Sequence, residues 1–176
     1  MKFIETKLNG SFILDIEKLE DERGFFARSW DKEKFDKIGL NSTISQCSLS
    51  HNDKKGTLRG MHFQEMPHQE VKIVSCVKGR IFDVIIDLRP RSSTLYEWEG
   101  VELSDENHKM LYVPEGFAHG FQTLEDNTEV FYQISQKHMP EFARGKLWND
   151  PLFNIVWPIK DPIISDKDTK WAKELS

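Results

Sequence analysis

The chain has 176 residues and a formal net charge of −5, from 24 Lys and Arg against 29 Asp and Glu. This length suits one domain over residues 1–176, and no apolar run approaches the roughly 20 residues of a membrane-spanning helix. The acidic balance excludes bulk binding of nucleic acid. Charges near Met1 interrupt any secretory signal, and Cys47 and Cys76 lack metal-type spacing. We expect a cytoplasmic protein with reduced thiols and no membrane partner.

Short β-strands separated by Gly, Pro, Asn and Asp dominate the pattern along the chain. The predicted strands are 12–16, 25–30, 43–50, 57–64, 71–77, 81–88, 95–103, 110–113, 118–124 and 129–134. Helices are predicted only at 31–38, between the capping residue Asp31 and Gly39, and at 167–174. Many strands with few helices favour an architecture that hides its sheet edges. We expect an all-β jelly-roll barrel with short flanking helices.

The strand 81–88 carries the strongest strand signal, with β-branched and aromatic residues in alternation. Asp83 and Asp87 share one parity. The side chains of the other parity are expected to face a core: Phe82, Val84, Ile86 and Leu88.

A glycine interrupts the strand 57–64 and separates two side chains that could do chemistry. Arg59 and His62 would face opposite ways if the strand alternated strictly. A β-bulge at Gly60 would turn both of them into the barrel. The alternative is that both lie on solvent-facing sides of the strand.

Two segments resemble the motifs of the cupin superfamily. The sequence VPEGFAHGFQ places His119 where the second cupin motif has a metal-binding histidine, and His62 stands where the first motif has another. Gln64 replaces a second histidine, and Lys72 replaces the usual glutamate. An ammonium has no lone pair for a metal and repels it, so we expect no metal. An alternative metal set remains open: His62, His68, Glu70 and His119.

The same residues suit proton transfer next to a ketone. Such a reaction needs a base that works near neutrality, and a cation beside the enolate oxygen. His62 and Lys72 fit these roles. Inversion also needs a proton donor on the other face of the carbon. Tyr132 alternates in step with the apolar Val130 and Ile134, so it would lie on the inward face of its strand. A core tyrosine would show the same pattern.

Ordered blocks along nearly the whole chain resemble the dTDP-4-dehydrorhamnose 3,5-epimerase family. These blocks lie at 21–30, 56–64, 77–94, 101–124, 147–151 and 164–168. The resemblance implies a jelly-roll homodimer that acts without metal or cofactor. Its reaction would invert C3, C5 or both in a nucleotide-diphosphate 4-keto-6-deoxy sugar, for the synthesis of rhamnose-type polysaccharides or glycosides.

The resemblance also implies roles for individual residues. It implies the catalytic residues His62 as base, Asp168 as its orienting carboxylate, Tyr132 as proton donor, and Lys72. It implies the substrate-binding residues Arg23, Phe26, Arg28, Gln46, Ser48, Arg59, His119 and Lys167. An Asp168 carboxylate that accepts from one ring nitrogen would fix the His62 tautomer, and the arginines can bridge phosphate oxygens.

Three positions depart from the family. Arg28 and Ala143 stand where glutamates are common, and Ser48 where asparagine is common. A carboxylate can accept from thymine N3–H, whereas cytosine and guanine offer acceptors to an arginine. The departures favour a cytidine-linked sugar, or else a guanosine-linked one, for which a 3- or 5-mono-epimerase is an alternative. The sequence is also compatible with a non-catalytic sugar-nucleotide-binding cupin, a metal-dependent cupin or a 3,4-ketoisomerase.

Overall fold

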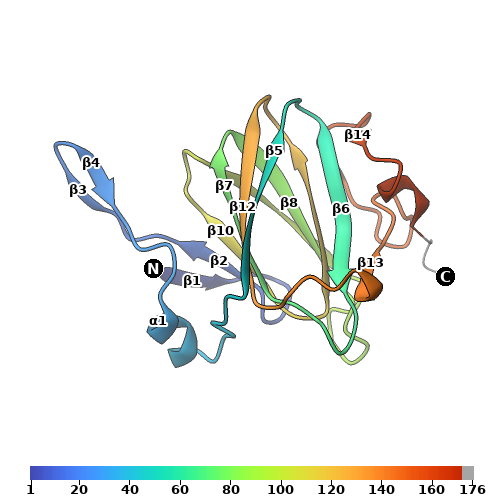
Figure 1. Ribbon diagram of the computed structural model, residues 1–176, viewed down its shortest axis with the longest axis horizontal. Helices are drawn as coiled ribbons and strands as arrows, with labels where there is room; N and C mark the ends of the chain where they lie inside the picture. The colour runs from blue at the N-terminus through green and yellow to red at the C-terminus, as the bar shows by residue number, and fades with distance from the viewer. Residues whose placement is uncertain (172–176) are drawn as a thin grey trace.

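Two antiparallel sheets face each other in the computed structural model, which describes residues 1–171 (Figure 1). The first sheet has the strand order β1 (Lys2–Glu5), β2 (Phe12–Asp15), β10 (Met110–Val113), β7 (Lys72–Lys78), β12 (Thr128–Ile134) and β5 (Gln46–Asn52). The second has the order β13 (Ala143–Gly145), β6 (Thr57–Gln64), β11 (Phe117–Thr123), β8 (Arg80–Asp87) and β9 (Trp98–Ser104), with β14 (Ile163–Ile164) parallel to β6. The predicted all-β fold is confirmed.

The remaining elements are short. A hairpin of β3 (Leu19–Asp21) and β4 (Gly24–Phe26) forms a third, separate sheet. The helix α1 (Lys32–Lys37) confirms the predicted helix: the Asp31 carboxylate accepts from Lys34 N, and Gly39 has a φ of +75°. Two 3₁₀ turns lie at η1 (Pro140–Phe142) and η2 (Asp168–Lys170). The predicted helix 167–174 is thus a single turn, and its residues 172–174 lie outside the described chain.

The strands were predicted well where they lie inside a sheet and poorly at the edges. The strands 57–64 and 110–113 have the predicted bounds. The prediction of a strand over 25–30 is wrong beyond Phe26, because β4 pairs only with the three residues of β3. Four further strands, β1, β3, β13 and β14, were not predicted, because they have two to four residues each and show little alternation.

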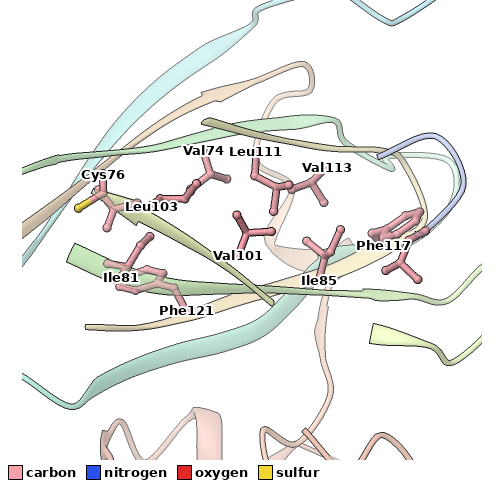
Figure 2. Close-up of a cluster of buried hydrophobic side chains, with 12 residues drawn as sticks. Val74, Cys76, Ile81, Ile85, Val101, Leu103, Leu111, Val113, Phe117 and Phe121 are labelled. Atoms are coloured by element: carbon pink, nitrogen blue, oxygen red, sulfur yellow. The ribbon is translucent and has the colours of Figure 1, made fainter. Parts of the chain in front are cut away.

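The main hydrophobic core fills the space between the two sheets (Figure 2). Most of its side chains come from β7 to β12, with Leu111 and Val74 from the first sheet opposite Ile81 and Ile85 from the second. The other face of β8 is buried as well. Val84 and Ile86 pack there with Phe153 and Trp157 of the C-terminal segment, as the parity predicted. Because both faces of β8 are covered, Asp83 and Asp87 are buried too.

The β3–β4 hairpin, residues 19–26, extends away from the barrel on the side opposite the C-terminal segment (Figure 1). We call it the arm. Its large apolar side chains are exposed: Leu19, Phe25 and Phe26. Phe25 contacts the ring of His108, with the ring centroids 4.9 Å apart. None of the helices among the described residues has the length and apolar character required to span a membrane.

Candidate active site

A bulge in β6 directs two predicted site residues to the same side. His62 pairs with His119 of β11, whereas Arg59 pairs with Phe121, so β6 has one residue more than its partner between these pairs. Gly60 lies in this bulge, and a Cβ there would come within 2.6 Å of the Cα of Gly120. Only a residue without a side chain allows this approach. Of the two alternatives at Gly60, the structure therefore has the bulge, and both side chains line one cavity.

This cavity has a volume of about 380 Å³ and lies between the two sheets. The first sheet contributes β5, β7 and β12, and the second β6, β11 and β13, with η2 beside them. Nine of the predicted site residues line it: Gln46, Ser48, Arg59, His62, Lys72, His119, Tyr132, Lys167 and Asp168. Folding therefore brings together residues from opposite ends of the sequence.

His62 and Asp168 form a hydrogen-bonded pair, with 2.6 Å between His62 Nε2 and Asp168 Oδ1. Burial alone would raise the pKa of Asp168. The hydrogen bond and the charge of His62, together with hydrogen bonds from Trp171 and Gly60, outweigh burial, so the pKa of Asp168 is lowered. An ionised Asp168 can only accept, so Nε2 is the donor in this bond, and in a neutral imidazole the lone pair then lies on Nδ1. The side chain of His62 is 40% exposed, against 6% for Asp168, so the ring remains accessible from the cavity.

Lys72, at the start of β7 in the first sheet, is held by two oxygen atoms. Its Nζ lies 2.9 Å from Glu70 Oε1 and 3.3 Å from the backbone carbonyl of His62, and both side chains of the ion pair are about a tenth exposed. A cation thus occupies the wall where a metal ligand would stand in a metal-binding cupin. No group of three His, Cys, Asp or Glu side chains within residues 1–171 could hold a metal. These residues do not fit a metal ion.

A second His–Asp pair lies deeper in the barrel. His119 Nε2 is 2.8 Å from Asp83 Oδ1, and both side chains are buried. Burial raises the pKa of Asp83, although His119 and Lys72 oppose the change. The rings of His119 and Tyr132 meet edge to face, with centroids 6.0 Å apart. Burial also raises the pKa of Tyr132, and the charge of Asp83 adds to it, so the phenol is protonated at neutral pH.

Three predicted site residues lie away from the cavity of their own chain. Arg23 and Phe26 are on the arm, where the side chain of Arg23 is 82% exposed and bonded to Asp21. Arg28 follows the arm and lies 3.8 Å from Asp31. The reason is the direction of the arm, which leaves the barrel on the far side from β6 (Figure 1).

Several polar cavity residues had no predicted role in proton transfer or substrate binding, and two of them, Glu70 and Trp171, contact the predicted catalytic residues directly. Trp171 Nε1 donates to Asp168 Oδ1 over 3.2 Å. Both residues had a usable signal in their spacing. Glu70 stands two positions before Lys72, on the same side of an extended chain, and Trp171 stands three positions after Asp168, one helical turn away.

Comparisons with known proteins agree with this geometry. Residues 5–175 match the family model described as dTDP-4-dehydrorhamnose 3,5-epimerase. A dTDP-4-dehydrorhamnose 3,5-epimerase from Methanothermobacter thermautotrophicus is 43% identical over 97% of this chain and 92% of its own. The crystal structure of such an enzyme from Bacillus anthracis, with TDP and PPi bound, superposes with a TM-score of 0.95 at 39% identity, covering 98% and 99% of the two chains.

A 3'-monoepimerase from Streptomyces bikiniensis, in complex with dTDP-quinovose, is also similar. Its TM-score is 0.88 at 27% identity, over 96% of this chain and 85% of that one. The same barrel thus serves proteins described as double and as single epimerases.

Proposed function

The chain belongs to the dTDP-4-dehydrorhamnose 3,5-epimerase family, and on this premise we propose that it inverts both C3 and C5 of a thymidine-diphosphate 4-keto-6-deoxy sugar. It is a sugar-nucleotide epimerase of deoxysugar biosynthesis. One observation supports inversion at carbon most directly, and the number of inverted carbons follows the names of the relatives. The hydrogen-bonded His62 and Asp168 lie on one side of the cavity. Tyr132 and Lys72 lie on the facing sheet.

The first step is proton abstraction by His62. Its Nδ1 lone pair takes the proton from the carbon next to the C4 ketone, and the C–H electron pair moves toward the carbonyl oxygen to give an enolate. The imidazolium that forms is stabilised by Asp168, which is ionised at neutral pH because its pKa is lowered. The Lys72 ammonium stabilises the negative charge on the enolate oxygen.

The second step is reprotonation from the opposite face. Tyr132 projects from the first sheet and donates its hydroxyl proton to the carbon, which reverses the configuration there. The phenolate recovers a proton from water, and His62 releases the abstracted proton to water. Repetition at the second carbon next to the ketone requires only that the sugar ring turn within the cavity.

The diphosphate and the nucleoside are bound at the basic rim. Arg59 is fixed by a 2.7 Å hydrogen bond from its Nε to Asn52 Oδ1 and by one of 3.4 Å from Nη2 to the carbonyl of His51, which leaves Nη1 for phosphate oxygens. Lys167 lies on the same rim. We assign the base as thymine, in place of the cytidine favoured by the sequence departures, because the relatives are named for dTDP sugars.

We also propose that the protein is a homodimer in which each arm reaches the cavity of the other copy. Arg23 and Phe26 cannot meet a substrate in the cavity of their own chain, because the arm extends away from it. Exposed Leu19 and Phe26 give the arm an apolar surface that a second copy would cover. A twofold axis would then place both arms equivalently.

The test replaces His62 by Ala and follows deuterium uptake from D₂O at C3 and C5 of a dTDP-4-keto-6-deoxy sugar. We expect the wild type to exchange both positions, and the variant to lose roughly 100- to 10,000-fold in rate, the contribution of a general base. A matched control is His51→Ala, since His51 lies outside the cavity and bonds Asp53 and Glu129.

Nucleotide binding, measured beside the exchange rate, distinguishes an epimerase from a protein that only binds sugar nucleotides. Titration of both proteins with dTDP, CDP and GDP should give the tightest binding for dTDP, with similar affinities for the wild type and the His62 variant. Unchanged exchange in the variant would remove His62 from the mechanism. Exchange at a single carbon would make the protein a mono-epimerase, and tighter binding of CDP would restore the cytidine alternative.

A further inference from the structure

The indole of Trp171 lies beside the His62–Asp168 pair and bonds to it. Trp171 Nε1 donates to Asp168 Oδ1, which also accepts from His62 Nε2. One carboxylate oxygen therefore serves two donors, at 3.2 Å and 2.6 Å. The indole also contacts the imidazole directly, with ring centroids 6.2 Å apart and planes at 69°.

A gap in the side chains of β13 makes room for this indole. Gly145 pairs with His62 across β13 and β6, and a Cβ built on Gly145 would overlap Nε1 and the two ring-fusion carbons of Trp171, Cδ2 and Cε2. On its other side, Lys167 Nζ lies 5.6 Å from the centroid of the indole. The indole is thus held by η2, β13 and β6 together, not only by its bond to Asp168.

We propose that Trp171 is a positioning residue for the catalytic base, acting through Asp168. Its N–H and its ring together fix the orientation of the carboxylate relative to His62. The N–H also takes up part of the negative charge that would otherwise be shared with His62 alone. This role rests on the proposed action of His62 as the base.

The chemical consequence follows from the competition between the two donors. Without the indole N–H, Asp168 Oδ1 would hold the His62 proton more strongly, and the pair would stay protonated to a higher pH. The other charged and titratable groups facing the pair from the cavity walls are the Glu70–Lys72 ion pair, Arg59, His119, Tyr132, His138, Arg144 and Lys167. None of these groups is itself changed by a substitution at Trp171.

The test is the variant Trp171→Phe, which keeps an aromatic ring and deletes the donor. We expect the acid limb of the pH profile of kcat/KM for solvent exchange to move up by about half a pH unit. We expect kcat to fall about threefold to tenfold, because the carboxylate is held less firmly. Trp98→Phe is the matched control, since Trp98 lies on β9 outside the cavity, and its profile should match the wild type.

A second variant removes the contact from the other side. Gly145→Ala adds the Cβ that overlaps the indole, so it should displace Trp171 and move the acid limb in the same direction as Trp171→Phe. An acid limb that stays at the wild-type pH in both variants would overturn the proposal. Wild-type protein without exchange at any pH would instead count against His62 as the base.

A measurement on the wild-type protein is independent of activity. The indole N–H resonance of Trp171, assigned by its loss from the spectrum of Trp171→Phe, should shift as the His62–Asp168 pair titrates. Support requires that its midpoint match that of the His62 ring protons. An indole resonance that does not move through this titration would show that Trp171 does not act on the pair.

Discussion

His62 performs its proposed function only because of residues around it. Asp168 fixes its tautomer, Gly60 allows its strand to bulge, and the backbone carbonyl of His62 holds Lys72. Alternation along the strand predicted the inward direction of Tyr132, because it depends only on neighbours in the chain. At Gly60 the sequence left strict alternation and a bulge open, and the pairing of β6 with β11 decided for the bulge. The ion pair of Lys72 with Glu70 was not predicted, because whether two charged side chains pair depends on whether the fold buries them together.

Glu70 should orient Lys72 for the enolate oxygen. In the wild type, Glu70 Oε1 lies 2.9 Å from Lys72 Nζ. The substitution Glu70→Gln removes the negative charge but keeps the shape of the side chain, so the Lys72 ammonium is held less firmly. We expect kcat to fall about tenfold with KM changed less than about threefold, since the loss affects the charged enolate more than the bound substrate. Steady-state kinetics of Glu70→Gln measure this split, with Glu129→Gln as the control outside the cavity. A rise in KM at constant kcat would place Glu70 in substrate binding instead.

At the scale of elements, a buried carboxylate at the end of β8 organises the turn that follows. Asp87 accepts from Arg89 through backbone and side chain, and from the hydroxyls of Ser92 and Thr94. Burial opposes ionisation of Asp87, but these hydrogen bonds outweigh it and lower its pKa to about 2. The turn 87–94 thus depends on a charged carboxylate that is inaccessible to solvent.

Asp87→Asn should therefore destabilise the fold in a pH-dependent way. Because the pKa of about 2 in the folded state is below the ordinary 3.8, the contribution is complete above about pH 4 and is lost as the pH falls toward 2. We expect a loss of about 2 kcal/mol in the free energy of unfolding at pH 7, and a smaller loss at pH 3. Urea unfolding at both pH values measures it.

The control for this variant is Asp53→Asn, because the side chain of Asp53 is 83% exposed. Its free energy of unfolding should stay within about 0.5 kcal/mol of the wild-type value. Equal destabilisation of Asp87→Asn at pH 7 and pH 3 would mean that its charge does not matter to the turn.

For the whole molecule, the arm is the feature that a single chain does not explain. Its apolar residues are exposed, and its predicted substrate contact Arg23 is bonded only to Asp21 among the interactions of the described residues. Sequence alternation cannot predict where a hairpin points, because that depends on the surface it packs against. The homodimer and the cytoplasmic location stay predictions.

Mixing two inactive chains tests the arm across copies. One chain carries Arg23→Ala and Phe26→Ala, and the other carries His62→Ala. In a mixed dimer the intact arm of the second chain would complete the intact base site of the first. We expect about a quarter of the wild-type rate after random exchange of subunits, since half of the dimers would each have one complete site.

The control is each variant alone, refolded in the same way, which should remain inactive. A mixture no more active than its parts would confine each arm to its own chain, and a monomer in light scattering would exclude the exchange altogether.

The sequence by itself determined the family, the all-β fold and the inward direction of Tyr132, and it offered a bulge at Gly60 as one of two alternatives. These rest on local pattern, where the φ freedom of glycine and the alternation of a strand fix where side chains point. The tertiary structure alone decided that Asp168 stands 2.6 Å from His62, 106 positions earlier, and that Trp171 fills the gap at Gly145. Such contacts depend on packing between distant segments, which no local pattern specifies.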